Sequence, residues 1–151
     1  MNFYLVRHGD AVSEREEPQR PLSERGRKEV EQIGRKLAAS EAQVFEILHS
    51  DKLRARETAE ILGRFLPPAE LRQSAGLAPD DDPEIARAEL EIASGPLMLV
   101  GHLPHLGRLL SLLLSGDSEG QHLDLPTAAA TCVFRDSRDW KLQWIFAPQS
   151  V

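Results

Sequence analysis

Short apolar segments alternate with longer segments of helical periodicity along this chain, and no other feature limits its fold as strongly. The apolar segments span residues 3–6, 44–48, 71–73, 97–100, 131–134 and 140–146. Between them lie stretches with apolar residues at helical spacing, the first of which carries Val30, Ile33 and Leu37. Strands that alternate with helices form a parallel sheet with helices on both faces. The sequence therefore predicts a three-layer α/β/α fold.

The last two apolar segments break this alternation, because only the polar residues 135–139 separate them. So short a connection joins antiparallel strands and leaves no room for a crossover helix. We therefore expect a mostly parallel sheet with one antiparallel strand near the C-terminus. The chain contains no internal repeat, low-complexity tract or long linker, so a single domain spanning residues 1–151 is predicted.

Residues that commonly begin helices support this order of elements. Ser23 is expected to be the N-cap of the first helix, and Ser50 and Asp51 offer cap residues for the second. Asp82 followed by Pro83 is typical of an N-cap and a first helical residue. A fourth helix is expected over residues 106–114, where leucines recur at helical spacing.

Charge and hydropathy argue against two broad classes of protein. The formal net charge of −6 is opposite to that of a general nucleic-acid binder. The longest leucine-rich stretch, residues 106–114, is interrupted by Arg108 and is far shorter than a membrane span. The apolar residues 3–6 are too few for a signal peptide, and the single cysteine, Cys132, excludes an internal disulfide. We therefore expect a cytoplasmic protein.

Basic residues stand just beyond the ends of three predicted strands. Arg7 and His8 follow the first strand, Arg54 comes shortly after the second, and His102 follows the strand at 97–100. Ligands bind outside the C-terminal ends of the strands in such sheets. The sequence therefore predicts that these four side chains meet at one edge and form a local positive pocket.

These residue types suit the transfer of a phosphoryl group. Arginine stays protonated and presents two donors to two phosphate oxygens at once. A histidine with one free ring nitrogen can act as a nucleophile, and Gly9 lets the backbone pass close to the bound group. His102 can hydrogen-bond a phosphoryl oxygen, provided that it is held protonated beside the phosphate.

Four ordered blocks cover essentially the whole chain and resemble the histidine phosphatase superfamily, which includes the cofactor-dependent phosphoglycerate mutases. The blocks are Leu5–Gly9, Pro21–Ser23 with Gly26, Ser50 followed by Leu53–Ala55 and Thr58, and Val100–His102. Within that superfamily, Arg7–Asp10, Arg20–Leu22 and Gly101–Pro104 are similar to bacterial SixA-type phosphohistidine phosphatases.

The resemblance implies a phosphoglycerate mutase-like fold with His8 as the catalytic nucleophile. It implies that Arg7, Arg54 and His102 bind the phosphoryl group, with Arg20 as a further phosphate ligand, and that neither a metal ion nor another cofactor is needed. It also implies a phosphohistidine-bearing protein as the partner, of which a phosphotransfer (HPt-like) domain or a phosphocarrier would be examples.

The chain departs from larger relatives at the general acid. Those relatives use an acidic residue after the third strand, no glutamate here matches it, and the nearest candidates are Asp80, Asp81 and Asp82. An alkoxide leaving group is strongly basic and needs a proton, whereas imidazole, with a pKa of about 6.5, can leave as a neutral ring. The missing acid therefore favours hydrolysis of a P–N bond over a P–O bond.

Other interpretations stay open at this point. A phosphatase of small phosphate esters would use one loop aspartate as its acid, and a non-catalytic phosphate-binding domain would not require His8. Cys132 and Arg138 have the C-x5-R spacing of cysteine-dependent phosphatases, although the intervening residues continue a strand and include no glycine. His105 is expected at the surface or packed on the last long helix.

Overall fold

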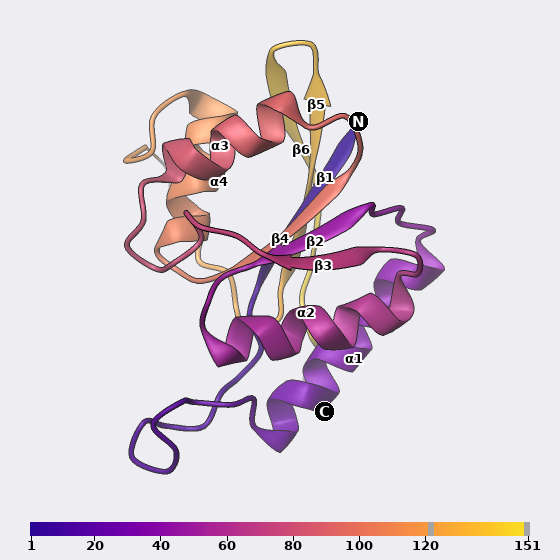
Figure 1. Cartoon of the computed structure of the whole chain (residues 1–151). Coiled ribbons are helices and arrows are strands. Elements are labelled where there is room, and N and C mark those ends of the chain that lie inside the picture. The colour runs from indigo at the N-terminus through magenta and orange to yellow at the C-terminus, as the bar shows by residue number, and fades with distance from the viewer. Residues whose placement is uncertain (121–122, 150–151) are drawn as a thin grey trace.

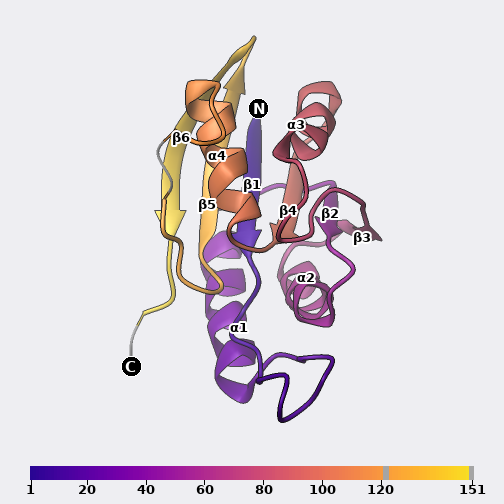
Figure 2. The same ribbon diagram turned by 90° about the vertical axis from the view of Figure 1, so that its left-hand side faces the viewer.

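The computed structural model describes residues 1–120 and 123–149, which form one six-stranded sheet between two layers of helices (Figure 1). The strands lie in the order β3-β2-β4-β1-β5-β6, which can be followed from right to left in Figure 2. Only β5 runs opposite to the others, since it pairs antiparallel with both β1 and β6. The predicted three-layer α/β/α fold, with one antiparallel strand near the C-terminus, is confirmed.

Each predicted strand and helix is present, with small shifts of its ends. The strands are β1 Asn2–Arg7, β2 Glu46–His49, β3 Glu70–Gln73, β4 Leu97–Gly101, β5 Ala130–Asp136 and β6 Asp139–Phe146. The helices are α1 Glu24–Ala39, α2 Leu53–Phe65, α3 Pro83–Ile92 and α4 His105–Ser115. None of the helices in the described part of the chain is both long and apolar enough to cross a membrane.

The central strands are buried on both faces, and their alternate residues enter two separate cores. Tyr4 and Val6 of β1 pack with α1 and α2, whereas Phe3 and Leu5 pack with α3 and α4. Successive side chains of a strand point to opposite faces, so one short apolar strand contributes to both cores. This double burial fixes where β1 ends, and hence where Arg7 and His8 emerge.

Two of the three predicted helix caps are confirmed. The Ser23 side chain accepts a hydrogen bond from the Gly26 amide, and Asp82 accepts one from the Glu84 amide. The predicted capping of α2 by Ser50 and Asp51 is wrong, because that helix begins at Leu53 and its N-cap, Lys52, makes no side-chain cap bond. The Ser50 hydroxyl lies against His102 instead.

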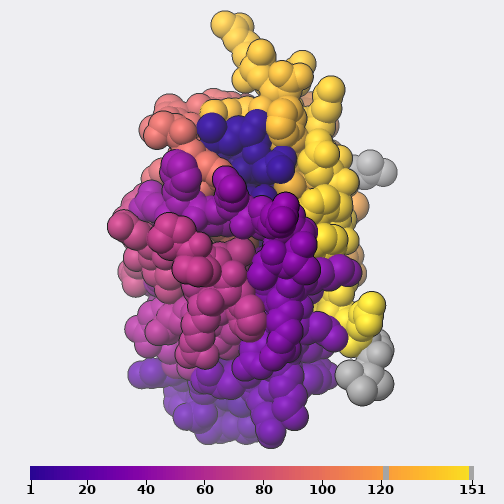
Figure 3. Space-filling view, turned by 90° about the vertical axis from the view of Figure 1, so that its right-hand side faces the viewer, coloured from indigo at the N-terminus to yellow at the C-terminus, as the bar shows by residue number. Residues whose placement is uncertain are grey.

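The β5–β6 hairpin lies at one edge of the sheet and projects at the end opposite the predicted site. Its turn is formed by residues 137–138, and the predicted antiparallel pairing is confirmed. Figure 3 shows this yellow hairpin extending beyond the start of β1. The Met1 amino group donates to the Arg135 carbonyl at 3.1 Å, which ties the start of the chain to the hairpin.

The loop after β1 is held tightly against the beginning of α1. The Ser23 amide donates to the Asp10 carbonyl at 2.9 Å, and the Ser23 hydroxyl donates to the Asp10 carboxylate at 2.6 Å. Arg25 forms an ion pair with the same carboxylate at 3.0 Å. A Cβ atom on Gly26 would lie only 2.0 Å from the Asp10 carbonyl oxygen, so the loop can pass here only because residue 26 has no side chain.

We predict that Gly26→Ala lowers the free energy of unfolding by about 1–3 kcal/mol, because backbone atoms cannot rotate away from the added methyl group. The midpoint of urea denaturation measures this loss. Gly107→Ala is the matched control within α4, where the new Cβ would meet only atoms at 3.6 and 3.8 Å. This control should be neutral or stabilising by up to about 1 kcal/mol. Equal midpoints for Gly26→Ala and the wild type would contradict the packing described.

Candidate active site

The C-terminal ends of β1, β2 and β4 bring the predicted residues together. Arg7 pairs with Gly101 in the β1–β4 register, and the His8 amide donates to the Gly101 carbonyl at 2.9 Å. The rings of His8 and His102 lie side by side, with centroids 4.9 Å apart. Arg54, in the first turn of α2, is close enough for its charge to act on both histidines. The four predicted side chains therefore meet at one edge.

His8 is buried and uncharged at neutral pH. Burial, together with the positive charges of Arg54, Arg7 and Arg20, lowers the pKa of its imidazole from 6.5 to about 4. Its Nδ1 atom lies 2.7 Å from the Gly9 carbonyl oxygen. Because a carbonyl oxygen can only accept, this contact requires the proton on Nδ1. The lone pair on Nε2 is then free, which is the state that a nucleophile needs.

A short chain of hydrogen bonds couples the backbone beside His8 to the helix that carries Arg54. The Gly9 amide donates to the Thr58 hydroxyl at 3.0 Å, and that hydroxyl donates to the Arg54 carbonyl at 2.8 Å. Thr58 is fully buried. His8 and Arg54 are thus held in register by a single side chain.

His102 is also uncharged, and its two ring nitrogens differ. Burial, together with the neighbouring His8 and Arg54, lowers the pKa of this imidazole to about 3. Nε2 lies 2.6 Å from the Ser50 hydroxyl, whereas Nδ1 is buried with no hydrogen-bond partner in the described residues. The sequence argument concerned a His102 that is protonated beside a bound phosphate, a state that the free site does not test; in the free site the lowered pKa keeps the imidazole neutral.

Arg7 and Arg54 supply the charge that the histidines lack. The Arg7 Nη1 atom donates to the Leu125 carbonyl at 2.7 Å, and this hydrogen bond holds the guanidinium in place. The Nε atoms of Arg7 and Arg54 are buried, and neither has a hydrogen-bond partner in the described residues. Burial also lowers the pKa of both groups, although arginine stays charged in proteins. Buried cations with unused N–H donors are suited to binding an anion.

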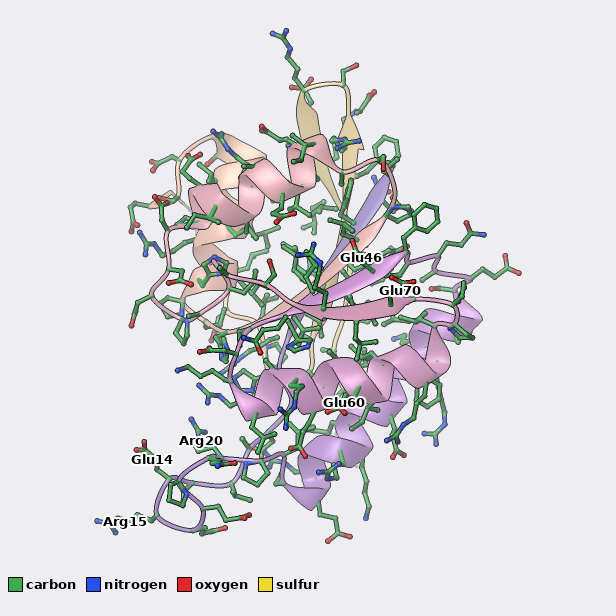
Figure 4. All side chains as sticks on the ribbon, viewed as in Figure 1. Glu14, Arg15, Arg20, Glu46, Glu60 and Glu70 are labelled. Atoms are coloured by element: carbon green, nitrogen blue, oxygen red, sulfur yellow. The ribbon has the colours of Figure 1, made fainter. Side chains whose placement is uncertain are left out.

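Arg20 reaches the same region from the loop between β1 and α1. Its Nε atom donates to the Val12 carbonyl at 3.0 Å, and its backbone has a φ of 53°. Figure 4 shows Arg20 on the side of this loop nearer the start of α2, whereas Arg15 points away at the outer end. The charge of Arg20 lowers the pKa values of both His8 and Arg54, which places this guanidinium near them.

An open pocket of about 690 Å³ lies between this loop and the start of α2. Arg20, Lys52, Arg54 and Arg56 are among its lining residues, together with two carboxylates, Glu14 and Asp51. The negative charges of Glu14 and Asp51 both raise the pKa of Arg54. Arg20 and Arg54 therefore adjoin a broad space of mixed charge.

The three loop aspartates have different environments. Asp82 caps α3, Asp80 is exposed, and the Asp81 carboxylate accepts a hydrogen bond from the Ala78 amide at 3.0 Å. Asp81 and Ser50 also line one pocket of about 370 Å³. Asp81 is therefore the loop carboxylate that shares a pocket with a neighbour of the histidines.

The competing cysteine motif does not form a phosphate-binding loop. Cys132 is fully buried within β5, and burial raises the pKa of its thiol to about 11. Arg138 lies in the hairpin turn beyond the end of that strand.

His105 is fully buried at the start of α4, so its predicted surface position is wrong and its predicted packing on that helix is correct. Its pKa is lowered by burial.

Two parts of the site had no signal in the sequence. Leu125, whose carbonyl fixes Arg7, is 118 residues away in the chain, and nothing in its composition marks it. The negative charge of Asp124, in the same segment, raises the pKa of Arg7.

His122 lies outside the described residues. Within those residues, no group of three or more His, Cys, Asp or Glu side chains could hold a metal ion.

Comparison with known proteins identifies the class that this fold and site define. Residues 3–78 match the histidine phosphatase superfamily (branch 1). An uncharacterized protein of Picosynechococcus is 33% identical over 85% of this chain and 81% of its own length. The chain belongs to the histidine phosphatase superfamily, and it is a phosphatase with the phosphoglycerate mutase-like fold.

Within the superfamily the chain is SixA-like. The phosphohistidine phosphatase SixA of Escherichia coli K12 is 25% identical to it over 98% of this chain and 94% of its own length. A structure of the protein histidine phosphatase SixA complexed with tungstate is 26% identical, covers 98% of this chain and 97% of that chain, and has a TM-score of 0.86. The α-ribazole phosphatase of Shigella flexneri shares the fold, with a TM-score of 0.78, 16% identity, and coverage of 99% of this chain and 96% of that chain.

We predict that Thr58→Val lowers turnover by about 10²-fold, because the loop that carries His8 is no longer tied to α2 and small misplacements are costly in catalysis. The buried Gly9 amide would also lose its partner, at a cost of about 1–3 kcal/mol in stability. Initial rates with a chromogenic phosphoryl donor and urea denaturation measure the two effects.

The matched control is Thr131→Val in β5. The Thr131 hydroxyl is equally buried, but it has no hydrogen-bond partner in the described residues. This variant should keep its turnover and be at least as stable as the wild type. If both valine variants lost turnover equally, the coupling through Thr58 would be refuted.

We also predict that His8 titrates near pH 4 rather than near 6.5. The shift is downward because burial and three arginines disfavour the imidazolium, so the His8 ring stays neutral until the pH falls towards 4. ¹⁵N NMR of the ring nitrogens against pH measures this directly, with the His8→Asn spectrum giving the assignment and the urea-unfolded protein giving the reference. A midpoint at or above 6.5 would contradict the arrangement.

Proposed function

We propose that the protein is a phosphohistidine phosphatase that acts on a phosphohistidine-bearing protein through a covalent intermediate on His8. The observation that carries this proposal is a neutral His8, with Nε2 free, beside three arginines and a second neutral histidine. Similarity to SixA phosphohistidine phosphatases over nearly the whole chain supports the same substrate class.

The reaction proceeds in two displacements at phosphorus. The Nε2 lone pair of His8 attacks the phosphoryl group, an Nε2–P bond forms, and the P–N bond to the substrate imidazole breaks. The substrate ring leaves as neutral imidazole when its phosphorylated form already carries a proton. Water then attacks phosphorus, the Nε2–P bond breaks, inorganic phosphate leaves with the water oxygen, and the released proton passes to solvent or phosphate.

The arginines stabilise the charge on the transferred group. Phosphoryl transfer depends mainly on positioning and on compensation of charge on the equatorial oxygens. Arg7 and Arg54 would bind those oxygens through their unused N–H donors, with Arg20 at the open side and His102 beside His8. Because guanidinium groups supply the positive charge, we propose that no metal ion is required.

The surroundings of the site favour a substrate carried on a protein. The pocket that contains Arg20 and Arg54 is broad and open, with room for a partner surface. We propose that residues 1–151 act as one histidine phosphatase domain, and that the partner is a phosphotransfer domain or a phosphocarrier in the cytoplasm.

A second candidate is a phosphatase of small phosphate esters. Asp81 shares a pocket with Ser50, so it is the loop carboxylate that could protonate an alkoxide leaving group. Its hydrogen bond from the Ala78 amide holds the carboxylate in place. The two candidates differ in whether the reaction depends on this acid.

We predict a preference for phosphohistidine in a competition among a phosphohistidine protein, a phosphohistidine peptide and a panel of phosphate esters. Asp80→Asn, Asp81→Asn and Asp82→Asn should each keep their activity on phosphohistidine, because a leaving imidazole needs no carboxyl acid. General acid catalysis typically contributes ~10²–10⁴-fold, so a true acid is easily detected. If Asp81→Asn lost two or more orders of magnitude (roughly the lower bound of that range) on esters that the wild type prefers, the small-ester function would replace this one.

His8→Ala is the companion variant in the same assay. It should stay folded, since the ring lies at a strand end and not in either hydrophobic core, yet it should release no phosphate. Turnover near the wild-type rate, or acid-labile phosphate trapped on another residue, would exclude His8 as the nucleophile.

A further inference from the structure

The Ser50 hydroxyl is buried between His102 and the start of α2. Its Oγ atom lies 2.6 Å from Nε2 of His102, and the Lys52 amide donates to the same oxygen at 3.3 Å. Ser50 is 1% exposed. Within the described residues, the Lys52 amide and His102 Nε2 are the hydrogen-bond partners of this hydroxyl.

The number of hydrogens available to the Ser50 hydroxyl indicates which partner donates in its hydrogen bond with His102. A serine hydroxyl has one hydrogen to donate, and the Lys52 amide already donates to the oxygen. If His102 Nε2 also donated to it, the hydroxyl hydrogen would be left without an acceptor in a buried place. The arrangement that satisfies every group has Ser50 donating to the Nε2 lone pair. The ring proton of His102 then lies on Nδ1.

Nδ1 of His102 is the atom that lacks a partner. It is buried and unpaired in the described residues, on a ring 4.9 Å from that of His8. A neutral imidazole donates from only one nitrogen, so an Nδ1–H tautomer offers a hydrogen bond where the Nε2–H tautomer would present a repelling lone pair. In the free site, where the pKa of His102 is lowered to about 3, the ring carries this single proton.

We propose that Ser50 is a positioning residue that fixes His102 as the Nδ1–H tautomer, so that the neutral ring donates a hydrogen bond to the phosphoryl group on His8. The inference rests on the proposed function in one respect, that the phosphoryl group binds between His8 and His102. The Lys52 amide at the start of α2 holds the Ser50 hydroxyl, so the same helix that carries Arg54 also orients this proton.

The first test reads the tautomer itself and requires no substrate. Long-range ¹H–¹⁵N NMR of the wild type at neutral pH should show His102 with a protonated Nδ1 and a non-protonated Nε2. Ser50→Ala should shift the ring towards the Nε2–H form, and Ser50→Thr, which keeps a hydroxyl, should restore the wild-type pattern. The inference would be overturned if His102 of the wild type were protonated on Nε2, or if the His102 tautomer in Ser50→Ala were the same as in the wild type. Either result would leave the proposed function intact.

The second test measures what the tautomer does for binding and turnover, with inorganic phosphate as the binding probe. Ser50→Ala should bind phosphate roughly tenfold more weakly, as expected for loss of one hydrogen bond to a charged group. Its kcat on phosphohistidine peptide should also fall about tenfold or more, and Ser50→Thr should recover most of both losses. If Ser50→Ala did not fold, Ser50→Cys, with a weaker donor of similar size, would give the same comparison.

Ser111→Ala is the matched control. Ser111 is another buried serine, whose hydroxyl donates to the Asp117 carbonyl in the segment after α4. This variant should leave the His102 tautomer, phosphate binding and kcat unchanged, and equal losses in both alanine variants would refute a specific role of Ser50. The expected tautomer in a protein that does not hydrolyse phosphohistidine would count against the proposed function alone.

Discussion

The parallel pairing of β1 with β4 is the constraint on which the site depends. It ends in the bond from the His8 amide to the Gly101 carbonyl, so the two histidines leave the sheet from adjacent strands at the same level. Both strands are buried on both faces, which prevents a shift of register because every side chain would move to the wrong core. The distance between the rings is therefore set by the hydrophobic interior and does not depend on a flexible loop.

Burial of these two rings gives the histidines and the arginines different charge states. In the free site, imidazoles placed this deeply beside guanidinium groups are neutral at neutral pH, so the positive charge resides on the arginines. What remains for each histidine is the placement of a single proton. A backbone carbonyl determines it at His8, and we infer that a serine hydroxyl determines it at His102. The two rings carry their proton on the same atom, Nδ1, but use opposite nitrogens: His8 presents its lone pair and His102 its N–H.

The order of strands and helices was sufficient to predict the fold and the residues that gather at the edge. The rule that parallel strands present their C-terminal ends together needs only the positions of apolar segments, which is why Arg7, His8 and His102 were found without coordinates. Ser50 was predicted to cap a helix, because a serine before a helical segment has the same local pattern whether its hydroxyl bonds along the chain or across the sheet. The hydrogen bond from Arg7 to the Leu125 carbonyl could not be predicted from the sequence, because every residue has a backbone carbonyl and none is marked by its residue type.

The loop between β1 and α1 is closed at its base by the bond from the Val12 amide to the Pro21 carbonyl and by the bridge between Ala11 and Leu22. Residues 13–19 extend beyond this closure and are exposed. Changes of length or composition there would alter the rim of the pocket without disturbing the sheet edge, because the entropic cost of lengthening a closed loop rises only slowly. The rim of the pocket at residues 13–19 can therefore change independently of the sheet edge that holds the histidines.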